Sequence, residues 1–390
     1  MMGSEVLKVV VPQTLFGMGA VNSLGDVVRS LGRTRVLIVT DQGLVKAGIV
    51  DTVQAALGSA SLKADVFDRC GLEAPVSAIE ELSRKAKDGG YDLLIGVGGG
   101  SVMDTTKAAS LLAANAGTTV QDLIEGKPVE KALAKILIPT TAGTGSEWSW
   151  AAVVTTDTAD DRTYPYFTPK NYPEAVIIDP ALTKDLPART TAETGIDALT
   201  HAIEAYTCSQ ANLLSDMYAS TAMKLISTSL RPAYAKGSLR LEDRYRLSIA
   251  AAMAMLAGSL AGVGMAHFMN HALGKKARIS HGATVGLMLP YVMEYNLISD
   301  PEKFAEVARL LGESTSGLST MDAALKSVAA VRRFLSDLDM PQHLTEVGIA
   351  AAGVPDLVDE LVTLQAFPLA FMNPREVGAK EATEIYLKAL

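Results

Sequence analysis

The chain has 390 residues, 48% of them hydrophobic, so it can bury a large core and is long enough for two domains. Its formal net charge of -8 leaves no basic surface for nucleic acid or anionic lipid, so we expect neither nucleic acid nor a membrane as a partner. Two cysteines are too few for a disulfide framework or a thiolate metal site, which agrees with a reducing cytoplasm. The first fourteen residues lack a basic region followed by a long apolar run, so we expect no signal peptide.

Short apolar runs alternate with helical patterns in the first part of the chain. The runs read as buried strands, and the segments between them have helical periodicity. In chain order the expected elements are a strand at Arg35–Thr40, a helix at Leu44–Leu57, a strand at Ala64–Phe67, a helix at Val76–Asp88 and a strand at Asp92–Val97. This alternation predicts a parallel sheet covered by helices on both faces.

A glycine-rich segment, Gly96-Val-Gly-Gly-Gly-Ser101, joins the last of these strands to a helical pattern at Val102–Asn115. Glycines let the backbone approach an anion closely, and the helix start supplies free N–H groups, so the segment suits a diphosphate. A tight turn with a serine cap is the alternative. The usual dinucleotide fingerprint places an acid about 20 residues after its glycines. Here the candidate acid, Asp41, comes first, so this is a different arrangement.

A second candidate cofactor segment follows the expected strand at Ile136–Pro139. It reads Thr140-Thr-Ala-Gly-Thr-Gly-Ser-Glu147, and its hydroxyl groups at the end of a strand could bind a ribose or a phosphate. An ordinary Ser/Thr-rich turn is the alternative. The run Val176–Ile178, closed by Asp179-Pro180, is expected to be the last strand of the sheet.

From Leu186-Pro187 to Leu390 the pattern is helical. We therefore divide the chain into an α/β domain, residues 1–185, and an all-helical domain, residues 186–390. Leu247–Ala266 contains no charged residue over twenty positions, which is long enough to consider a membrane span. Its abundance of Ala, Gly, Ser and Met favours a buried central helix instead.

Histidines cluster in the second domain. Of the five in the chain, three lie between Gly264 and His281, and His267 and His271 share one face of a helix if the segment is helical. Asp197 and His201 have the same four-residue offset. Any one of these residues alone is more often a packed core residue than a ligand, at odds of about two to one, because intermediate burial is ordinary for histidine. Two such pairs in Ala-rich segments would be costly to bury without a shared partner, so a common metal is the favoured interpretation.

These motifs together resemble the iron-containing (group III) alcohol dehydrogenase family. The resemblance runs in order from about Pro12 to the C-terminus. It rests on Gly98-Gly-Gly-Ser101 with Asp104 and Lys107, Pro139-Thr-Thr-Ala-Gly-Thr-Gly-Ser-Glu147, Gly195-Ile-Asp-Ala-Leu-Thr-His201, His267-x3-His271 and His281-Gly282.

The resemblance implies an α/β dinucleotide-binding domain with a parallel sheet, followed by an all-helical metal-binding domain, in a dehydroquinate synthase-like fold with the active site in the cleft between the two. The implied metal ligands are Asp197, His201, His267 and His281, with His271 beside the nicotinamide and the substrate. The implied cofactor-binding residues are Asp41, Gly98, Gly99, Gly100, Ser101, Thr140, Thr141, Thr144 and His271.

The sequence departs from the family in one region. A lysine that often contacts the cofactor is absent, so Arg162 is the candidate substitute, and Trp148-Ser-Trp150 follows Glu147 where Val-Thr is usual. For the two tryptophans, core packing and lining of the cleft are equally favoured.

A divalent ion held by three imidazoles and one carboxylate would favour loss of the proton from an alcohol, with hydride passing to NAD and His271 relaying the proton. The expected metal is Fe²⁺, with Zn²⁺ or Mn²⁺ as alternatives, and NAD is expected over NADP. The expected substrates are small neutral primary alcohols, diols or aldehydes, and we expect a cytoplasmic homodimer or higher homo-oligomer. Three alternatives remain: a metal- and NAD-dependent lyase of the dehydroquinate-synthase type, a glycerol-dehydrogenase-like polyol oxidoreductase, and a non-catalytic binding protein.

Overall fold

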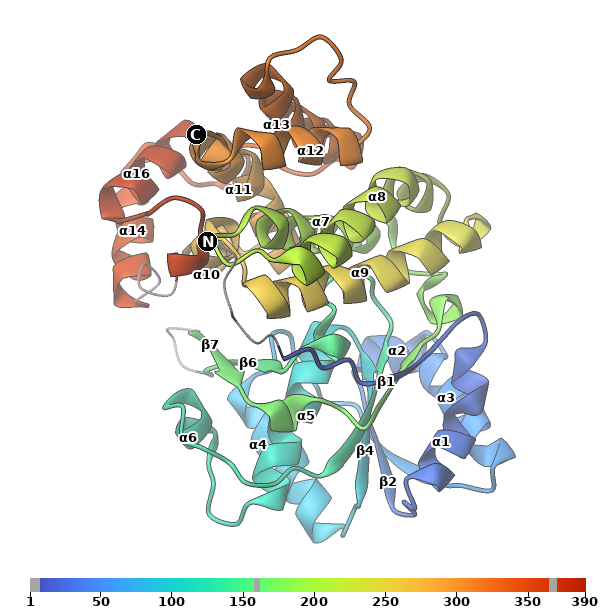
Figure 1. Cartoon of the computed structure of the whole chain (residues 1–390). Helices are drawn as coiled ribbons and strands as arrows, with labels where there is room; N and C mark the ends of the chain where they lie inside the picture. Colours follow the sequence, from blue (N-terminus) through green and yellow to red (C-terminus); the bar gives the residue numbers. More distant parts are fainter. Residues whose placement is uncertain (1–7, 158–161, 365–369) are drawn as a thin grey trace. The chain divides into compact units, whose positions relative to one another are not determined.

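The computed structural model describes residues 8–157, 162–364 and 370–390 (Figure 1). The chain divides into two compact units. One comprises Pro12–Thr191 and Ala235–Ala252, and the other comprises Ala192–Tyr234, Met253–Leu390 and the described residues of Met1–Val11. The domain division at residues 185 and 186 stays a prediction.

The first unit is built on a parallel sheet of six strands in the order β1-β8-β5-β4-β2-β3. The strands are β1 (Gln13–Phe16), β2 (Val36–Val39), β3 (Ala64–Phe67), β4 (Leu93–Gly98), β5 (Ala134–Pro139) and β8 (Ala175–Ile178). The predicted strands and the parallel sheet are confirmed. The last predicted strand, β8, lies inside the sheet, between β5 and β1, and β1 was not predicted.

Helices cover both faces of this sheet, because alternate strand residues point to opposite sides. Val36 and Ile38 pack with α1 (Leu24–Ser30) and α3 (Ile49–Ser59), whereas Leu37 and Val39 pack with α4 (Val76–Asp88) and α5 (Gly100–Ala114). Figure 1 shows α1 and α3 on one side of the strands and α4 and α5 on the other. The helices of this unit are α1 (Leu24–Ser30), α2 (Gln42–Lys46), α3 (Ile49–Ser59), α4 (Val76–Asp88), α5 (Gly100–Ala114) and α6 (Val120–Ile124). The single helix predicted at Leu44–Leu57 is two helices, α2 and α3, because Gly48 between them has φ 74°, which ends a right-handed helix.

An antiparallel pair, β6 (Ala151–Thr155) and β7 (Thr163–Phe167), follows the Thr-rich segment and was not predicted. Short 3-10 turns complete the first unit: η1 (Ala20–Ser23), η2 (Ser146–Trp148), η3 (Pro169–Asn171), η4 (Pro180–Thr183) and η5 (Gly237–Leu239).

Among its described residues the second unit contains helices and no strand. Its helices are α7 (Ala188–Thr207), α8 (Leu213–Lys236), α9 (Leu241–Ala261), α10 (Met265–Ala277), α11 (His281–Asn296), α12 (Pro301–Leu310), α13 (Thr320–Asp337), α14 (Val354–Thr363) and α16 (Ala379–Lys388). The first turn of α7, the last two residues of α8 and the part of α9 up to Ala252 belong to the other unit. Its 3-10 turns are η6 (Leu297–Ser299), η7 (Leu344–Val347), η8 (Ala351–Gly353) and η9 (Ala370–Met372). Met265, Ala266 and Met269 of α10 pack into one apolar core with residues of α11, α14 and α16.

The uncharged stretch Leu247–Ala266 is not one helix. α9 ends at Ala261 and α10 begins at Met265, because Gly262 between them has φ 95°, a left-handed conformation that ends a right-handed helix. The Met372 side chain fills the space that a side chain at this position would need. Among the described residues no single helix is long and apolar enough to cross a membrane; α9 and α10 meet that test only as a pair, bent by 109°.

Candidate functional site

One face of α7 carries three acidic or imidazole side chains. Asp197, His201 and Glu204 are spaced i, i+4 and i+7, so they share the face of the helix. All three are buried, at 2%, 5% and 5% exposure. The helix presents this polar stripe inside an otherwise Ala-rich segment, so each group needs a partner there.

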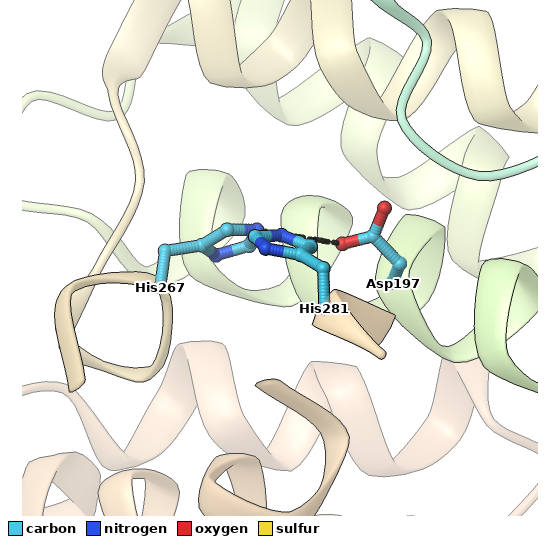
Figure 2. A group of neighbouring side chains, drawn as sticks. All are labelled: Asp197, His267 and His281. Atoms are coloured by element: carbon cyan, nitrogen blue, oxygen red, sulfur yellow. Dashed lines mark ion pairs between the residues drawn. The ribbon is translucent and has the colours of Figure 1, made fainter. Parts of the chain in front are cut away.

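Two histidines from other helices meet Asp197. The Nε2 atom of His267, on α10, lies 3.6 Å from Asp197 Oδ1, and the Nε2 atom of His281, the first residue of α11, lies 3.4 Å from the same oxygen. One ligand-type atom from each of the three residues lies within 4.8 Å of the others (Figure 2). The Ser280 side chain caps α11 by accepting a hydrogen bond from the backbone N–H of Ala283. This cap fixes the start of α11 at His281.

Several buried polar atoms in this cluster have no hydrogen-bond partner among the described residues. They are Asp197 Oδ1, His267 Nε2 and His201 Nδ1. The separations around Asp197 are too long for hydrogen bonds and leave room for an atom between the groups. Imidazole nitrogens with a carboxylate oxygen are ligands that divalent transition metals accept, so the cluster fits such an ion.

His201 lies beside this group of three. Its Nδ1 atom is 3.6 Å from Asp197 Oδ1, and its ring centroid is 4.2 Å from that of His267. The structure therefore brings all four sequence-predicted ligands together, with His201 outside the set whose atoms converge within 4.8 Å.

Burial and charge set the protonation states of these groups. Burial lowers the pKa of His201 to about 3, and burial with the neighbouring His281 and His267 lowers the pKa of His271 to about 4. Burial opposes the charged form of His267 as well, but the carboxylates of Glu204 and Asp197 raise its pKa to about 9. For Asp197 burial is likewise outweighed, because His201 and His281 hold the pKa well below its usual range. His201 and His271 are thus neutral near pH 7.

Sequence reasoning missed two residues that contact the histidines. Glu204 Oε2 lies 2.5 Å from His267 Nδ1, and the side-chain amide of Asn270 lies 2.8 Å from His281 Nδ1. The position of Glu204, one turn beyond His201 on the same face, was the available signal. His271 lies one turn after His267 on α10 and is not part of the converging group.

In the α/β unit, three predicted cofactor segments follow neighbouring strands at the carboxyl edge of the sheet. Asp41 comes after β2, Gly98–Ser101 begins with the last residue of β4, and Thr140 follows β5; these strands are adjacent and parallel. The carboxyl edge of such a sheet is where ligands bind in open α/β folds. Thr140 N donates to Gly98 O at 3.0 Å, which joins two of the segments directly.

The glycine segment is shaped by what lies against it. Gly99 caps α5, whose first residue is Gly100. A side-chain carbon on Gly100 would lie 2.8 Å from Thr144 Cγ2, and one on Gly99 would already touch Thr141 at 3.4 Å. The glycines therefore let the two cofactor segments pack together, with the first N–H groups of α5 unpaired within the helix.

A buried lysine holds the Thr-rich segment in place. Lys107 Nζ, fully buried on α5, donates to Ser146 O at 2.7 Å, to Ser146 Oγ at 2.6 Å and to Ala151 O at 2.7 Å. Asp104, one turn earlier, accepts from Ser146 Oγ at 2.6 Å and from Val153 N at 3.2 Å. This gives Asp104 and Lys107 a structural role behind the cofactor segments.

The remaining predicted residues have local roles. Asp41 caps α2 by accepting from Leu44 N at 3.0 Å, and Ser101 Oγ accepts from Glu73 N at 2.9 Å. Arg162, which follows the undescribed residues 158–161, pairs its backbone with Thr156 at the base of the β6–β7 connection. Trp148 is buried and donates from Nε1 to Thr14 Oγ1 at 3.0 Å, as core packing requires. Trp150 packs against Phe167, with ring centroids 5.2 Å apart.

Comparison with known proteins identifies the family. The sequence pattern of "Iron-containing alcohol dehydrogenase" matches residues 12–180, and that of "Fe-containing alcohol dehydrogenase family, C-terminal" matches residues 191–390. The chain therefore belongs to the iron-containing alcohol dehydrogenase family, and the predicted resemblance and fold class are confirmed.

Individual relatives agree over nearly the full length. Long-chain-alcohol dehydrogenase 1 of Geobacillus thermodenitrificans is 38% identical over 90% of this chain and 89% of its own. The NAD-dependent methanol dehydrogenase of Bacillus methanolicus is 35% identical over 97% and 98%. The crystal structure of a 1,3-propanediol oxidoreductase superposes with a TM-score of 0.94 at 34% sequence identity. The superposition covers 99% of this chain and 100% of the other.

Proposed function

We propose that the protein is a metal-dependent, NAD-linked alcohol dehydrogenase and aldehyde reductase. The observation that carries this proposal is the convergence of Asp197 Oδ1 with the Nε2 atoms of His267 and His281. Of these atoms, Asp197 Oδ1 and His267 Nε2 are buried without a hydrogen-bond partner among the described residues. Family membership supports the reaction class, and the donor set supports a metal-assisted step.

The proposed metal ligands are Asp197, His201, His267 and His281, and the proposed ion is Fe²⁺, with Zn²⁺ and Mn²⁺ as alternatives. A divalent ion there supplies a Lewis acid that polarises the oxygen of an alcohol or a carbonyl. His201 would be the fourth ligand, since its Nδ1 atom lies 3.6 Å from Asp197 Oδ1.

The proposed cofactor is NAD. Gly98, Gly99, Gly100 and Ser101 would hold the diphosphate at the start of α5, and Thr140, Thr141 and Thr144 would offer hydroxyl groups from the adjoining segment. One Asp41 oxygen is used by the helix cap, which leaves the other for a ribose hydroxyl, while the charge repels a 2′-phosphate. Arg162 remains a candidate contact with the cofactor.

His271 is the proposed proton carrier. It is neutral near pH 7, because burial lowers its pKa to about 4, so its lone pair is available to accept a proton. Its place one turn from His267 keeps it close to the metal ligands without joining the converging group.

For the substrate we propose a small neutral primary alcohol, a diol or the matching aldehyde. No lysine or arginine lies between Leu247 and His271, the run that leads into the histidines, so this segment supplies no charge to hold a phosphate or a dicarboxylate. The relatives named above carry the names of a long-chain alcohol, methanol and 1,3-propanediol as substrates. Others are named choline dehydrogenase and sulfoacetaldehyde reductase, whose substrates are charged, so this proposal rests on the uncharged segment alone. We also propose a cytoplasmic homodimer or higher homo-oligomer.

The test is NADH formation by the purified protein, with Fe²⁺, Zn²⁺ or Mn²⁺ added to metal-stripped samples. We expect activity with ethanol, butanol or 1,3-propanediol, and none in the Asp197→Asn variant, whose elemental metal content should also fall. A panel in which only phosphorylated or dicarboxylic alcohols react would contradict the substrate proposal. Activity unaffected by stripping the metal would contradict the metal-dependent reaction itself.

A further inference from the structure

The side of His267 that faces away from Asp197 is held by a carboxylate. Glu204 Oε2 lies 2.5 Å from His267 Nδ1, and Glu204 is 5% exposed. An ionised carboxylate only accepts hydrogen bonds, so Nδ1 must carry the proton in this pair. With Nδ1–H paired to Glu204, Nε2 is the ring nitrogen that can offer a lone pair to a metal, and Nε2 faces Asp197 at 3.6 Å.

The same carboxylate anchors the start of α10. Its Oε2 atom accepts from Gly264 N at 2.9 Å, and its Oε1 atom accepts from Ala266 N at 2.7 Å. Glu204 thus receives three N–H groups from the segment that carries His267. Gly264 leaves the space for it, because a side-chain carbon at that position would lie 2.8 Å from Glu204 Oε1. One side chain of α7 therefore sets both the position of α10 and the tautomer of His267.

His281 has an equivalent partner in Asn270. The Asn270 amide lies 2.8 Å from His281 Nδ1 through its nitrogen, and its oxygen accepts from Thr284 Oγ1. The nitrogen and oxygen of an amide exchange places by a half-turn of the side chain. With its oxygen toward His281, Asn270 accepts from Nδ1–H, and its nitrogen donates to Thr284 Oγ1. The Thr284 hydroxyl group then donates its own hydrogen to His281 O at 2.8 Å. In this orientation of Asn270 each hydrogen bond among His281, Asn270 and Thr284 has one donor and one acceptor.

We propose that Glu204 and Asn270 are positioning residues that hold His267 and His281 as Nδ1–H tautomers, so that both Nε2 lone pairs face Asp197. Outer hydrogen bonds of this kind orient metal-binding histidines and raise their basicity. The inference rests on the proposed metal site and adds two residues and one amide orientation to it.

The first test replaces Glu204 by glutamine. The two oxygens of Glu204 accept hydrogen bonds from three N–H groups. A glutamine replaces one of these oxygens by an NH₂ group, so at least one of the three N–H donors then faces another donor. We expect Zn²⁺ affinity, measured on stripped protein by competition with a chromophoric chelator, to fall roughly 10- to 100-fold. If Glu204→Gln does not fold, Gly264→Ala gives the same measurement, because the added methyl group displaces Glu204 Oε1.

Asp179→Asn is the matched control. Asp179 is 1% exposed and also accepts three N–H groups, from Gly19, Val21 and Ala181, in the α/β unit. This variant should lower the unfolding temperature of the metal-free protein and leave Zn²⁺ affinity unchanged. If Glu204→Gln behaves in the same way, Glu204 is only a helix anchor and the proposal fails.

The second test uses two replacements of Asn270. Asn270→Asp keeps an acceptor opposite His281 Nδ1 and should bind Zn²⁺ at least as tightly as the unaltered protein. Asn270→Leu removes the acceptor and should weaken binding roughly 10- to 100-fold. If Asn270 instead donates to His281, Asn270→Asp will weaken binding as much as Asn270→Leu, and the assigned tautomer is wrong.

Asp197→Asn separates these outcomes from failure of the metal site itself. It should abolish tight Zn²⁺ binding whatever Glu204 and Asn270 do. If it binds Zn²⁺ as the unaltered protein does, the ion lies elsewhere and the proposed function fails first.

Discussion

Gly282, directly after His281, is a residue outside the proposed ligand set at which one added methyl group should disturb the metal site. A side-chain carbon added there would lie 2.1 Å from the carbonyl oxygen of Glu193 and 2.7 Å from its carbonyl carbon. These are backbone atoms of α7, which cannot swing aside as a side chain can. Because non-bonded heavy atoms settle at about 3.5 Å, α11 and α7 must separate by more than about 1 Å in the Gly282→Ala variant.

That displacement acts on stability and on metal binding together. Overpacking of this kind typically costs about 1–3 kcal/mol of the free energy of unfolding. Moving His281 by roughly 1 Å relative to Asp197 exceeds the tolerance of about 0.2 Å on metal–ligand distances, so we expect Zn²⁺ affinity to fall at least about tenfold. Thermal unfolding of the metal-free protein and chelator competition measure the two effects separately.

Gly258→Ala is the control for this substitution. Gly258 is also a buried helical glycine of the second unit, but a side-chain carbon there would meet only Val263 at 3.5 Å, an ordinary contact. This variant should unfold within about 1 kcal/mol of the unaltered protein, or slightly above it, because alanine favours a helix. Unchanged Zn²⁺ affinity and unfolding in Gly282→Ala would refute the reasoning.

Three further predictions concern single residues. His267→Ala should lose metal and activity together, whereas His271→Ala should keep most of its metal while turnover falls roughly 10²- to 10⁴-fold. Elemental analysis measures the metal content of both variants, and equal metal loss in both would make His271 a ligand. Asp41→Asn should keep the cap on α2 and raise the catalytic efficiency with NADP relative to NAD. Asp41→Gly should relax the same cofactor preference and also weaken the cap. An unaltered protein that uses both cofactors equally would contradict the role of Asp41. Glu147 is buried, and burial raises its pKa from 4.5 to about 7. The folded protein therefore binds the proton more tightly than the unfolded chain, so the free energy of unfolding falls as pH rises from about 4.5 through 7. Glu147→Gln should therefore be more stable than the unaltered protein at pH 8, by on the order of 3 kcal/mol, with little difference at pH 4, and equal urea unfolding curves at both pH values would show that Glu147 does not titrate in this range.

Local pattern predicted most of the α/β unit. The strand at Ala64–Phe67 and the helix at Val76–Asp88 have the predicted bounds, since each is a short segment whose apolar residues repeat with one period. The pairs Asp197/His201 and His267/His271 could be recognised for the same reason, because a four-residue offset on a helix is local information. The glycine segment and its position between a strand and a helix were also evident from neighbouring residues.

Other features depend on residues far apart in the chain, and the tertiary structure alone decided them. Glu204 meets Gly264 across 60 positions, so its three hydrogen bonds leave no periodic trace in the sequence. The end of α9 at Ala261 follows from the left-handed backbone of Gly262 against Met372, 110 residues later, although composition alone favoured a continuous helix. β8 lies inside the sheet rather than at its edge because β1, from the start of the chain, pairs with it. Strand order and the partners of buried polar groups are set by long-range packing, whereas single strands and helical faces are set by the residues within them.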